Sequence, residues 1–189
     1  YLKTFTIPVT AMPGDVLFRM PICPIQTMNK LLLTESAIPT MVEYMSLFFS
    51  FWSGDLKLKA EFVGNAFMKT RVKFVTHFGA TVSEEGILSG QQFSHTYDYD
   101  VADNTVEVTM PWKSTLSSLK VPGGSYRTLD EFATGELSIV LVNALVVPDT
   151  VRPAMDVNLF FSGGENFTLS GLYNKRVDYQ VGPFNLSPL

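Results

Sequence analysis

Two histidines are the side chains best suited in this sequence to bind a metal ion or to transfer a proton. His77 and His95 lie eighteen positions apart. A catalytic metal site in a β protein needs several His and carboxylate donors that converge on one ion, typically with two histidines in His-x-His order on one strand. The sequence contains no such pair. Both histidines are therefore predicted to be ordinary surface or loop residues, and no metal ligand is assigned.

A nucleophilic site would need a Ser or Cys that a nearby His activates. No Gly-x-Ser-x-Gly turn is present, and the one cysteine, Cys23, lies in the sequence Pro-Ile-Cys-Pro. This context favours a small buried apolar residue over a nucleophile. A single cysteine also excludes an internal disulfide and is typical of a reducing compartment. No catalytic residue is assigned, and we predict that the protein is not an enzyme.

Acidic residues occur in pairs that could serve as a general acid and base. The pairs are Glu84 with Glu85, Asp98 with Asp100, and Asp130 with Glu131. No second set of functional residues accompanies them, so solvated loop charge explains them better. Asp98, Asp100 and Asp103 could also bind a cation weakly, but they lack the regular spacing of a calcium loop. No cofactor is therefore expected.

Two Asn-x-Ser/Thr sequons begin at Asn166 and Asn185. Such sequons are common by chance. Pro188 disfavours the second one, and the cysteine usage disfavours both. We do not expect a glycosylation site.

Length and composition indicate one domain rich in β structure. Of the 189 residues, 46% are hydrophobic and 17% are charged. This is enough to bury one core but makes two domains improbable. Fifteen Phe, seven Tyr, eleven Pro and thirteen Gly are typical of short strands joined by frequent turns. We expect a single all-β domain over residues 1–189.

The charge balance and the apolar stretches exclude two classes of protein. The net charge is −4 and there is no run of basic residues, which disfavours a general nucleic-acid-binding surface. The densest apolar stretch, Tyr44–Trp52, is about half as long as a helix that spans a bilayer. No transmembrane segment is predicted.

Alternation of apolar and polar residues predicts nine strands. The five clearest are Asp55–Phe62, Arg71–Phe78, Thr105–Met110, Glu136–Asn143 and Asp156–Phe161, and the weaker four are Thr4–Val9, Val16–Met20, Phe93–Tyr99 and Asn166–Leu169. Pro8 must lie at an edge or a bulge because it cannot donate to a ladder. Helical spacing of Met41, Tyr44, Met45 and Phe48 predicts one helix over about Thr40–Phe49. Residues Lys113–Thr134 read as a long loop.

These elements predict two antiparallel sheets packed as a sandwich or jelly roll. The pattern by itself does not separate a viral shell domain from a lectin, a cytokine-like module or a cupin.

Five stretches combine aromatic, glycine and polar residues in a distinctive order. They are Phe49–Leu58 (FSFWSGDLKL), Thr70–Val75 (TRVKFV), Tyr97–Ser114 with its closing PWKS, Gly135–Leu145 (GELSIVLVNAL) and Val157–Phe167 (VNLFFSGGENF). In this order they resemble strands D to I of the capsid shell domain of dicistroviruses, iflaviruses and their picornavirus relatives. The resemblance covers nearly the whole chain.

The resemblance implies an eight-stranded antiparallel jelly roll with sheets B-I-D-G and C-H-E-F and one or two short helices. Phe5–Val9 and Gly14–Pro21 both fall in its strand C region, so strand B is predicted to be missing. Strand I would then present a long unpaired edge, which natural proteins avoid. We therefore expect the natural polypeptide to continue upstream of Tyr1, as a fragment of a longer capsid protein.

The resemblance also implies a structural role in a virion. The chain is expected to form an icosahedral, pseudo-T=3 shell with other jelly-roll capsid proteins and to assemble in the host cytoplasm. Contact with genomic RNA is expected only indirectly or through the arm upstream of Tyr1, and the sequence identifies no host receptor. The Lys113–Thr134 loop corresponds to the family's G–H loop, which lies on the outer side. Asp130–Phe132 is similar to a self-cleavage motif of some relatives but stands in another loop, so it receives no catalytic role.

An alternative from a different class stays open. A cellular jelly-roll module that binds carbohydrate would use exposed aromatic residues or calcium loops. A cupin-type enzyme is a more distant alternative.

Overall fold

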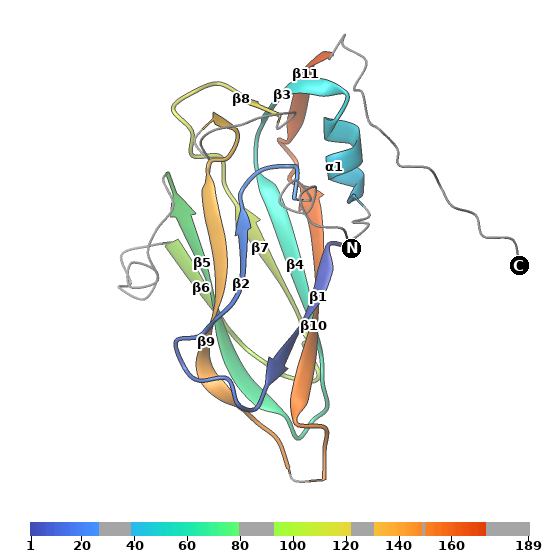
Figure 1. Cartoon of the computed structure of the whole chain (residues 1–189), viewed down its shortest axis with the longest axis vertical. Coiled ribbons are helices and arrows are strands. Elements are labelled where there is room, and N and C mark those ends of the chain that lie inside the picture. The colour runs from blue at the N-terminus through green and yellow to red at the C-terminus, as the bar shows by residue number, and fades with distance from the viewer. Residues whose placement is uncertain (27–38, 80–92, 122–130, 149, 173–189) are drawn as a thin grey trace, which may run out of the picture.

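The computed structural model describes residues 1–26, 39–79, 93–121, 131–148 and 150–172. Two four-stranded antiparallel sheets face each other and form a sandwich (Figure 1). The first sheet has the order β1 (Lys3–Pro8), β10 (Ala154–Gly163), β4 (Leu56–Val63) and β7 (Thr105–Met110). The second has the order β2 (Val16–Pro21), β9 (Gly135–Val146), β5 (Lys69–Phe78) and β6 (Phe93–Asp98).

A third, smaller sheet lies at one end of the sandwich. It consists of β11 (Thr168–Leu172), β3 (Phe49–Ser53) and β8 (Leu119–Lys120). The helix α1 (Met41–Ser46) lies at the same end (Figure 1). No helix among the described residues is long and apolar enough to cross a bilayer.

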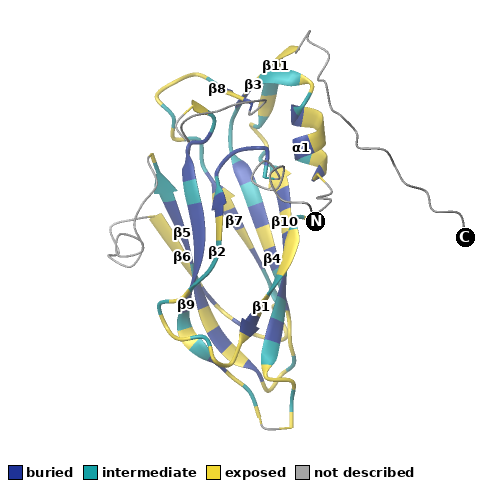
Figure 2. Cartoon of the chain, in the orientation of Figure 1, coloured by how far each residue is buried: buried dark blue, intermediate teal, exposed yellow. Residues whose placement is uncertain are grey.

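The alternating residue pattern explains how each sheet buries one face. In β4 the even positions Leu56, Leu58, Ala60 and Phe62 are buried, whereas the odd positions are partly or fully exposed (Figure 2). This is the two-residue period of a half-buried strand. The Phe62 ring stacks at 4.9 Å on the ring of Tyr97 from the opposite sheet, so aromatic contacts join the two layers.

All nine predicted strands are present, although the boundaries differ by a few residues at several ends. The all-β jelly-roll prediction is confirmed. Pro8 closes the edge strand β1, as expected of a residue that cannot donate to a ladder.

The prediction that strand B is missing was wrong. Strand β1 pairs with β10 over six residues, from Lys3 opposite Leu159 to Pro8 opposite Ala154, and it covers the edge that was expected to be free. Both strands were predicted, but the resemblance assigned both to the strand C region, because β1 and β2 lie close together in the chain. Residues 9–15 turn between the two sheets instead, with Gly14 at φ +98° and the Asp15 carboxylate accepting from the Met12 N–H at 2.8 Å. The unpaired edge therefore gives no reason to expect an upstream strand.

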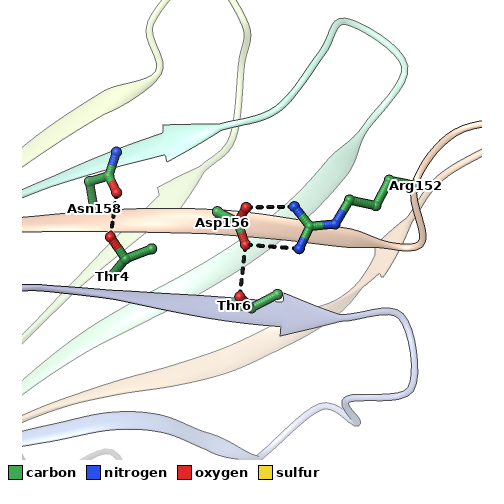
Figure 3. A network of polar contacts seen from close by, with 5 residues as sticks. All are labelled: Thr4, Thr6, Arg152, Asp156 and Asn158. Carbon is green, nitrogen blue, oxygen red and sulfur yellow. Dashed lines mark hydrogen bonds and ion pairs between the residues drawn. The ribbon is translucent and has the colours of Figure 1, made fainter.

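Polar side chains fasten β1 to β10 on the outer face of the sheet (Figure 3). Thr4 donates to the Asn158 side chain and Thr6 donates to Asp156, each at 2.7 Å. The Arg152 guanidinium bridges to the same Asp156 carboxylate at 2.6 Å. The threonine hydroxyl, followed by Arg152, lowers the pKa of Asp156.

The helix is shorter than predicted. It ends at Ser46, and Phe49–Ser53 forms β3 rather than a last turn of helix. The reason is that Phe49–Ser53 pairs with β11 on one side and β8 on the other. β8 was not predicted, because two residues show no periodicity. The rest of the Lys113–Thr134 loop includes residues 122–130, which lie outside the described part.

Candidate interaction surface

Helix α1 and the turn that follows it present several large apolar side chains to solvent. Met41 is 75% exposed, and Tyr44, Met45 and Phe48 are each about half exposed. The buried positions are instead polar, Glu43 and Ser46. Val42 and Leu47 pack partly buried against the core. The apolar side chains of this segment are therefore divided between the core and solvent, whereas an ordinary surface helix buries its apolar stripe. We call Met41, Tyr44, Met45 and Phe48 the α1 patch.

Local contacts hold helix α1 in place. Thr40 is the N-cap, and its hydroxyl accepts from the Glu43 N–H at 3.2 Å. The Ser46 hydroxyl donates to the Val42 carbonyl at 2.7 Å, so this buried polar group is satisfied within the helix. The Tyr44 and Phe48 rings meet edge to face at 5.4 Å. The apolar side chains are therefore held in a defined arrangement on the outside.

A buried aromatic junction supports the end of the sandwich that carries α1. Trp52 of β3 is 1% exposed, meets Trp112 edge to face at 4.9 Å, and donates from Nε1 to the Phe132 carbonyl at 2.9 Å. Phe167 packs on the same indole at 6.3 Å between ring centroids. We call Trp52, Trp112 and Phe167 the tryptophan junction. It joins β3 to the segments that follow β7 and β10.

Hydrogen bonds of Asp55 close the tryptophan junction. Its carboxylate accepts from the Trp112 N–H at 2.7 Å, and its own N–H donates to the Asn166 side chain at 2.8 Å. Its carbonyl accepts from the Gly164 N–H at 2.7 Å. Three motifs singled out in the sequence, FSFWSGDLKL, PWKS and SGGENF, therefore meet at one place. Asn166, the first sequon residue, has a structural role there.

The two histidines lie on neighbouring strands of one sheet. His95 is exposed on β6, and His77 is partly buried on β5. His77 Nε2 is buried without a hydrogen-bond partner among the described residues. Burial, and then the nearby Arg19 charge, lower the pKa of His77. Glu136, its pairing partner on β9, bonds to Arg19 at 3.2 Å.

Cys23 is fully buried, as the sequence predicted. Its thiol donates to the Ile25 carbonyl at 3.0 Å. Burial raises the pKa of Cys23 to about 12, so the nucleophilic thiolate is disfavoured. Its environment is that of a core residue.

Two acidic residues at and after the end of β6 interact with other groups of the same chain. Arg71 forms an ion pair with Asp98, with Nη2 2.9 Å from Oδ2, and this pairing lowers the pKa of Asp98. Asp100 accepts from the Ala102 N–H at 3.1 Å. No group of three metal-binding side chains occurs in the described ranges. Glu84, Glu85 and Asp130 lie outside those ranges, so the interpretation of their charge as solvated loop charge is untested.

A shallow groove of about 480 Å³ runs beside Asp98. Its lining includes the basic Lys69 and Arg71 and the acidic Asp98 and Asp100. The ion pair between Arg71 and Asp98 already joins two of these charges. The groove therefore shows no uncompensated charge of one sign that would select a charged ligand.

Comparisons with known proteins connect this architecture to viral particles. No protein-family model matches the chain. The chain is similar to the genome polyprotein of avian encephalomyelitis virus, strain L2Z, with 24% identity over 188 residues. The match covers 97% of this chain but only 8% of the polyprotein.

Solved structures are similar over almost the whole chain. The structure of sacbrood virus of honeybee matches with a TM-score of 0.78 and 19% identity, covering 98% of this chain and 74% of the other. The empty capsid of Triatoma virus matches with a TM-score of 0.80 and 18% identity, covering 100% and 77%. The chain has the jelly-roll fold of picornavirus-like capsid proteins.

The strands can now be named by the capsid convention. The sheet β1-β10-β4-β7 is B-I-D-G, and the sheet β2-β9-β5-β6 is C-H-E-F. The sequence motifs had placed strands D to I correctly. What the sequence missed was the identity of β1 as strand B and the outward direction of the α1 patch. Neither property leaves a local signal in the sequence. Helical spacing shows which residues share one face of the helix, but it does not show whether that face contacts the core or solvent.

Proposed function

We propose that this chain is a structural subunit of the icosahedral shell of a picornavirus-like positive-strand RNA virus. The observation that carries the proposal is the order of the eight sandwich strands in two sheets, B-I-D-G and C-H-E-F. Its match to viral particle structures supports a structural role over the carbohydrate-binding alternative and over an enzyme.

The partners in this proposal are other jelly-roll capsid proteins, which complete a pseudo-T=3 shell. The α1 patch supports this assignment, because an apolar surface held on the outside of a small domain is typical of a protein contact. The acidic net charge of −4 disfavours direct contact of this domain with the genomic RNA. Assembly in the host cytoplasm and residence in the virion are parts of the same proposal.

Co-expression tests the proposal. The chain is produced together with the other capsid proteins of its polyprotein, and the products are separated on a sucrose gradient and viewed by negative-stain microscopy. We expect closed particles a few hundred ångströms across that contain this chain. Particles that form without it, or a lone monomer with measurable sugar affinity, would contradict the proposal.

A further inference from the structure

The methionines of the chain fall into two groups by exposure. Four of the seven in the described part are at most 5% exposed, namely Met20, Met68, Met110 and Met155. The other three lie on the surface, where Met41 is 75% exposed, Met12 68% and Met45 46%. Methionine packs well in cores because its thioether is apolar and adaptable. Only the surface group therefore calls for an explanation.

Two of the exposed methionines lie together on helix α1. Met41 and Met45 are four residues apart, so their side chains share one face of the helix. Both belong to the α1 patch, in which the rings of Tyr44 and Phe48 meet edge to face. Met12 lies in the turn between β1 and β2, at the other end of the sandwich (Figure 1). The α1 patch therefore carries two accessible thioethers, and the distant third one offers a comparison.

No other sulfur atom of the described residues is comparably open to solvent. Cys23 is fully buried, and its thiol donates to the Ile25 carbonyl at 3.0 Å. Burial raises the pKa of this thiol to about 12, so the thiolate that reacts with oxidants is scarce at neutral pH. Among the described residues, a dissolved peroxide therefore meets Met41, Met45 and Met12 before it meets the cysteine.

Oxidation of a thioether changes its polarity without breaking the chain. The methionine sulfur attacks one oxygen of hydrogen peroxide, and the O–O bond breaks. A proton passes from the transferred oxygen to the leaving hydroxide, which departs as water. The sulfur is oxidised by two electrons and the peroxide is reduced by two. The resulting sulfoxide is polar, so its burial in an apolar contact without a hydrogen-bond partner is unfavourable.

We propose that Met41 and Met45 form a reversible oxidation site that controls assembly. The α1 patch makes its subunit contact while both thioethers are reduced, and it loses that contact when they become sulfoxides. Methionine sulfoxide reductases restore the thioethers, with one enzyme for each sulfoxide epimer. The inference rests on the proposed capsid function, and it adds the condition that the free subunit stays reduced until assembly covers the patch.

Oxidation of the free chain tests the site itself. The chain is treated with hydrogen peroxide for increasing times, and each methionine is followed by peptide mass spectrometry. We expect Met12, Met41 and Met45 to be oxidised at least about tenfold faster than the four buried methionines, because susceptibility follows exposure. The thermal transition should persist at this stage, since exposed positions contribute little to stability. Equal rates at exposed and buried positions, or loss of the transition when only the exposed ones are oxidised, would overturn the proposal.

Assembly of the oxidised chain tests the control. After the peroxide is removed, oxidised and untreated samples are each combined with the other capsid proteins, and particles are quantified on a sucrose gradient. We expect about tenfold fewer particles from the oxidised chain, and we expect both reductases together to restore the yield. A normal yield from the oxidised chain would overturn the oxidation site and leave the capsid function intact, whereas an untreated chain that gives no particles would overturn both.

Leucine variants identify the methionines that matter. Leucine has nearly the volume of methionine, so the exchange costs little, and it has no sulfur to oxidise. Met41→Leu combined with Met45→Leu should assemble like the natural chain and should still assemble after peroxide treatment. Met12→Leu is the matched control and should lose assembly on oxidation as the natural chain does. Loss of assembly by the oxidised double variant, or protection by Met12→Leu, would refute the assignment to α1.

Discussion

At Gly54 the chain passes so close to a neighbouring segment that no side chain fits. A Cβ at this position would lie 2.2 Å from the Asn166 carbonyl oxygen, and φ is +97°. Gly14 has nearly the same φ, +98°, but no atom within 4 Å of its added Cβ. A comparison of substitutions at the two glycines therefore distinguishes the cost of backbone strain from the cost of steric overlap.

We predict that Gly54→Ala destabilises the protein more than Gly14→Ala. Strain at positive φ costs about 1–2 kcal/mol for alanine, and this should be the whole effect at Gly14. Overlap with backbone adds about 1–3 kcal/mol at Gly54, because the Asn166 segment must move. Urea denaturation of both variants measures the difference. Equal losses would show that the tryptophan junction is not rigid at this point.

Single residues were predictable where the reason is local. The burial of Cys23 follows from its residue type and its Pro-Ile-Cys-Pro context. The role of Asp55 does not, because its partners Trp112 and Asn166 lie 57 and 111 positions away in the sequence. Only the chain topology brings them together.

At the level of elements, α1 shows that a correct helix prediction leaves its orientation open. The helical spacing of Met41, Tyr44, Met45 and Phe48 predicted the helix but gave no information on which side faces solvent. Helix α1 buries Glu43 and Ser46 instead. The sequence leaves the orientation open because a helix that packs on the core and a helix that packs on another protein carry similar apolar stripes.

The α1 patch yields a prediction about assembly. Met41→Gln combined with Tyr44→Gln should change the free energy of unfolding of the isolated chain by less than about 0.5 kcal/mol, as is usual for exposed positions. The same double variant should reduce particle yield severalfold, because polar groups would enter a protein contact. Tyr44→Phe keeps the ring and is the control. Thermal melts and gradient sedimentation provide the two measurements, and undiminished particle yield would contradict the assigned role.

The hydrogen bonds to Asp156 beside β1 predict how the stability of the fold depends on pH. Because Thr6 and Arg152 lower the pKa of Asp156, the ionised carboxylate stabilises the fold above its unfolded pKa of about 3.9. That contribution is lost as the pH falls through the lower, folded value. Asp156→Asn should therefore be less stable than the natural chain at pH 7, and the difference should shrink toward pH 3.

Urea denaturation at pH 7, 5 and 3 checks this pH dependence. Thr6→Val removes the hydroxyl donor without changing the shape of the side chain, so it should give part of the effect of Asp156→Asn. A difference that stays constant across the pH range would show that Asp156 does not act through its charge.

For the whole molecule, the decisive strand is β1, which the sequence predicted as a strand but the resemblance assigned to the strand C region. Deleting residues 1–8 should expose the β10 edge over its full pairing with β1 and remove the buried Ile7. We expect loss of a cooperative thermal transition and aggregation on gel filtration. The double variant Thr4→Val with Thr6→Val keeps the backbone pairing and should remain monomeric. A folded, monomeric deletion variant would show that β1 is dispensable.

Strand periodicity predicted a sandwich of two antiparallel sheets, and the resemblance carried by the motifs implied the order of strands within them. The assignment of the first two strands failed because each is compatible with either sheet. Their separation depends on pairing with β9 and β10, which lie more than 110 residues further along the chain.

The tryptophan junction also makes the molecule optically convenient. The two tryptophans of the chain, Trp52 and Trp112, are in contact there. All intrinsic indole fluorescence therefore comes from one location, with no background from distant sites. A shift of emission to longer wavelength would report the opening of the end that carries α1, β3 and β11, without any attached dye.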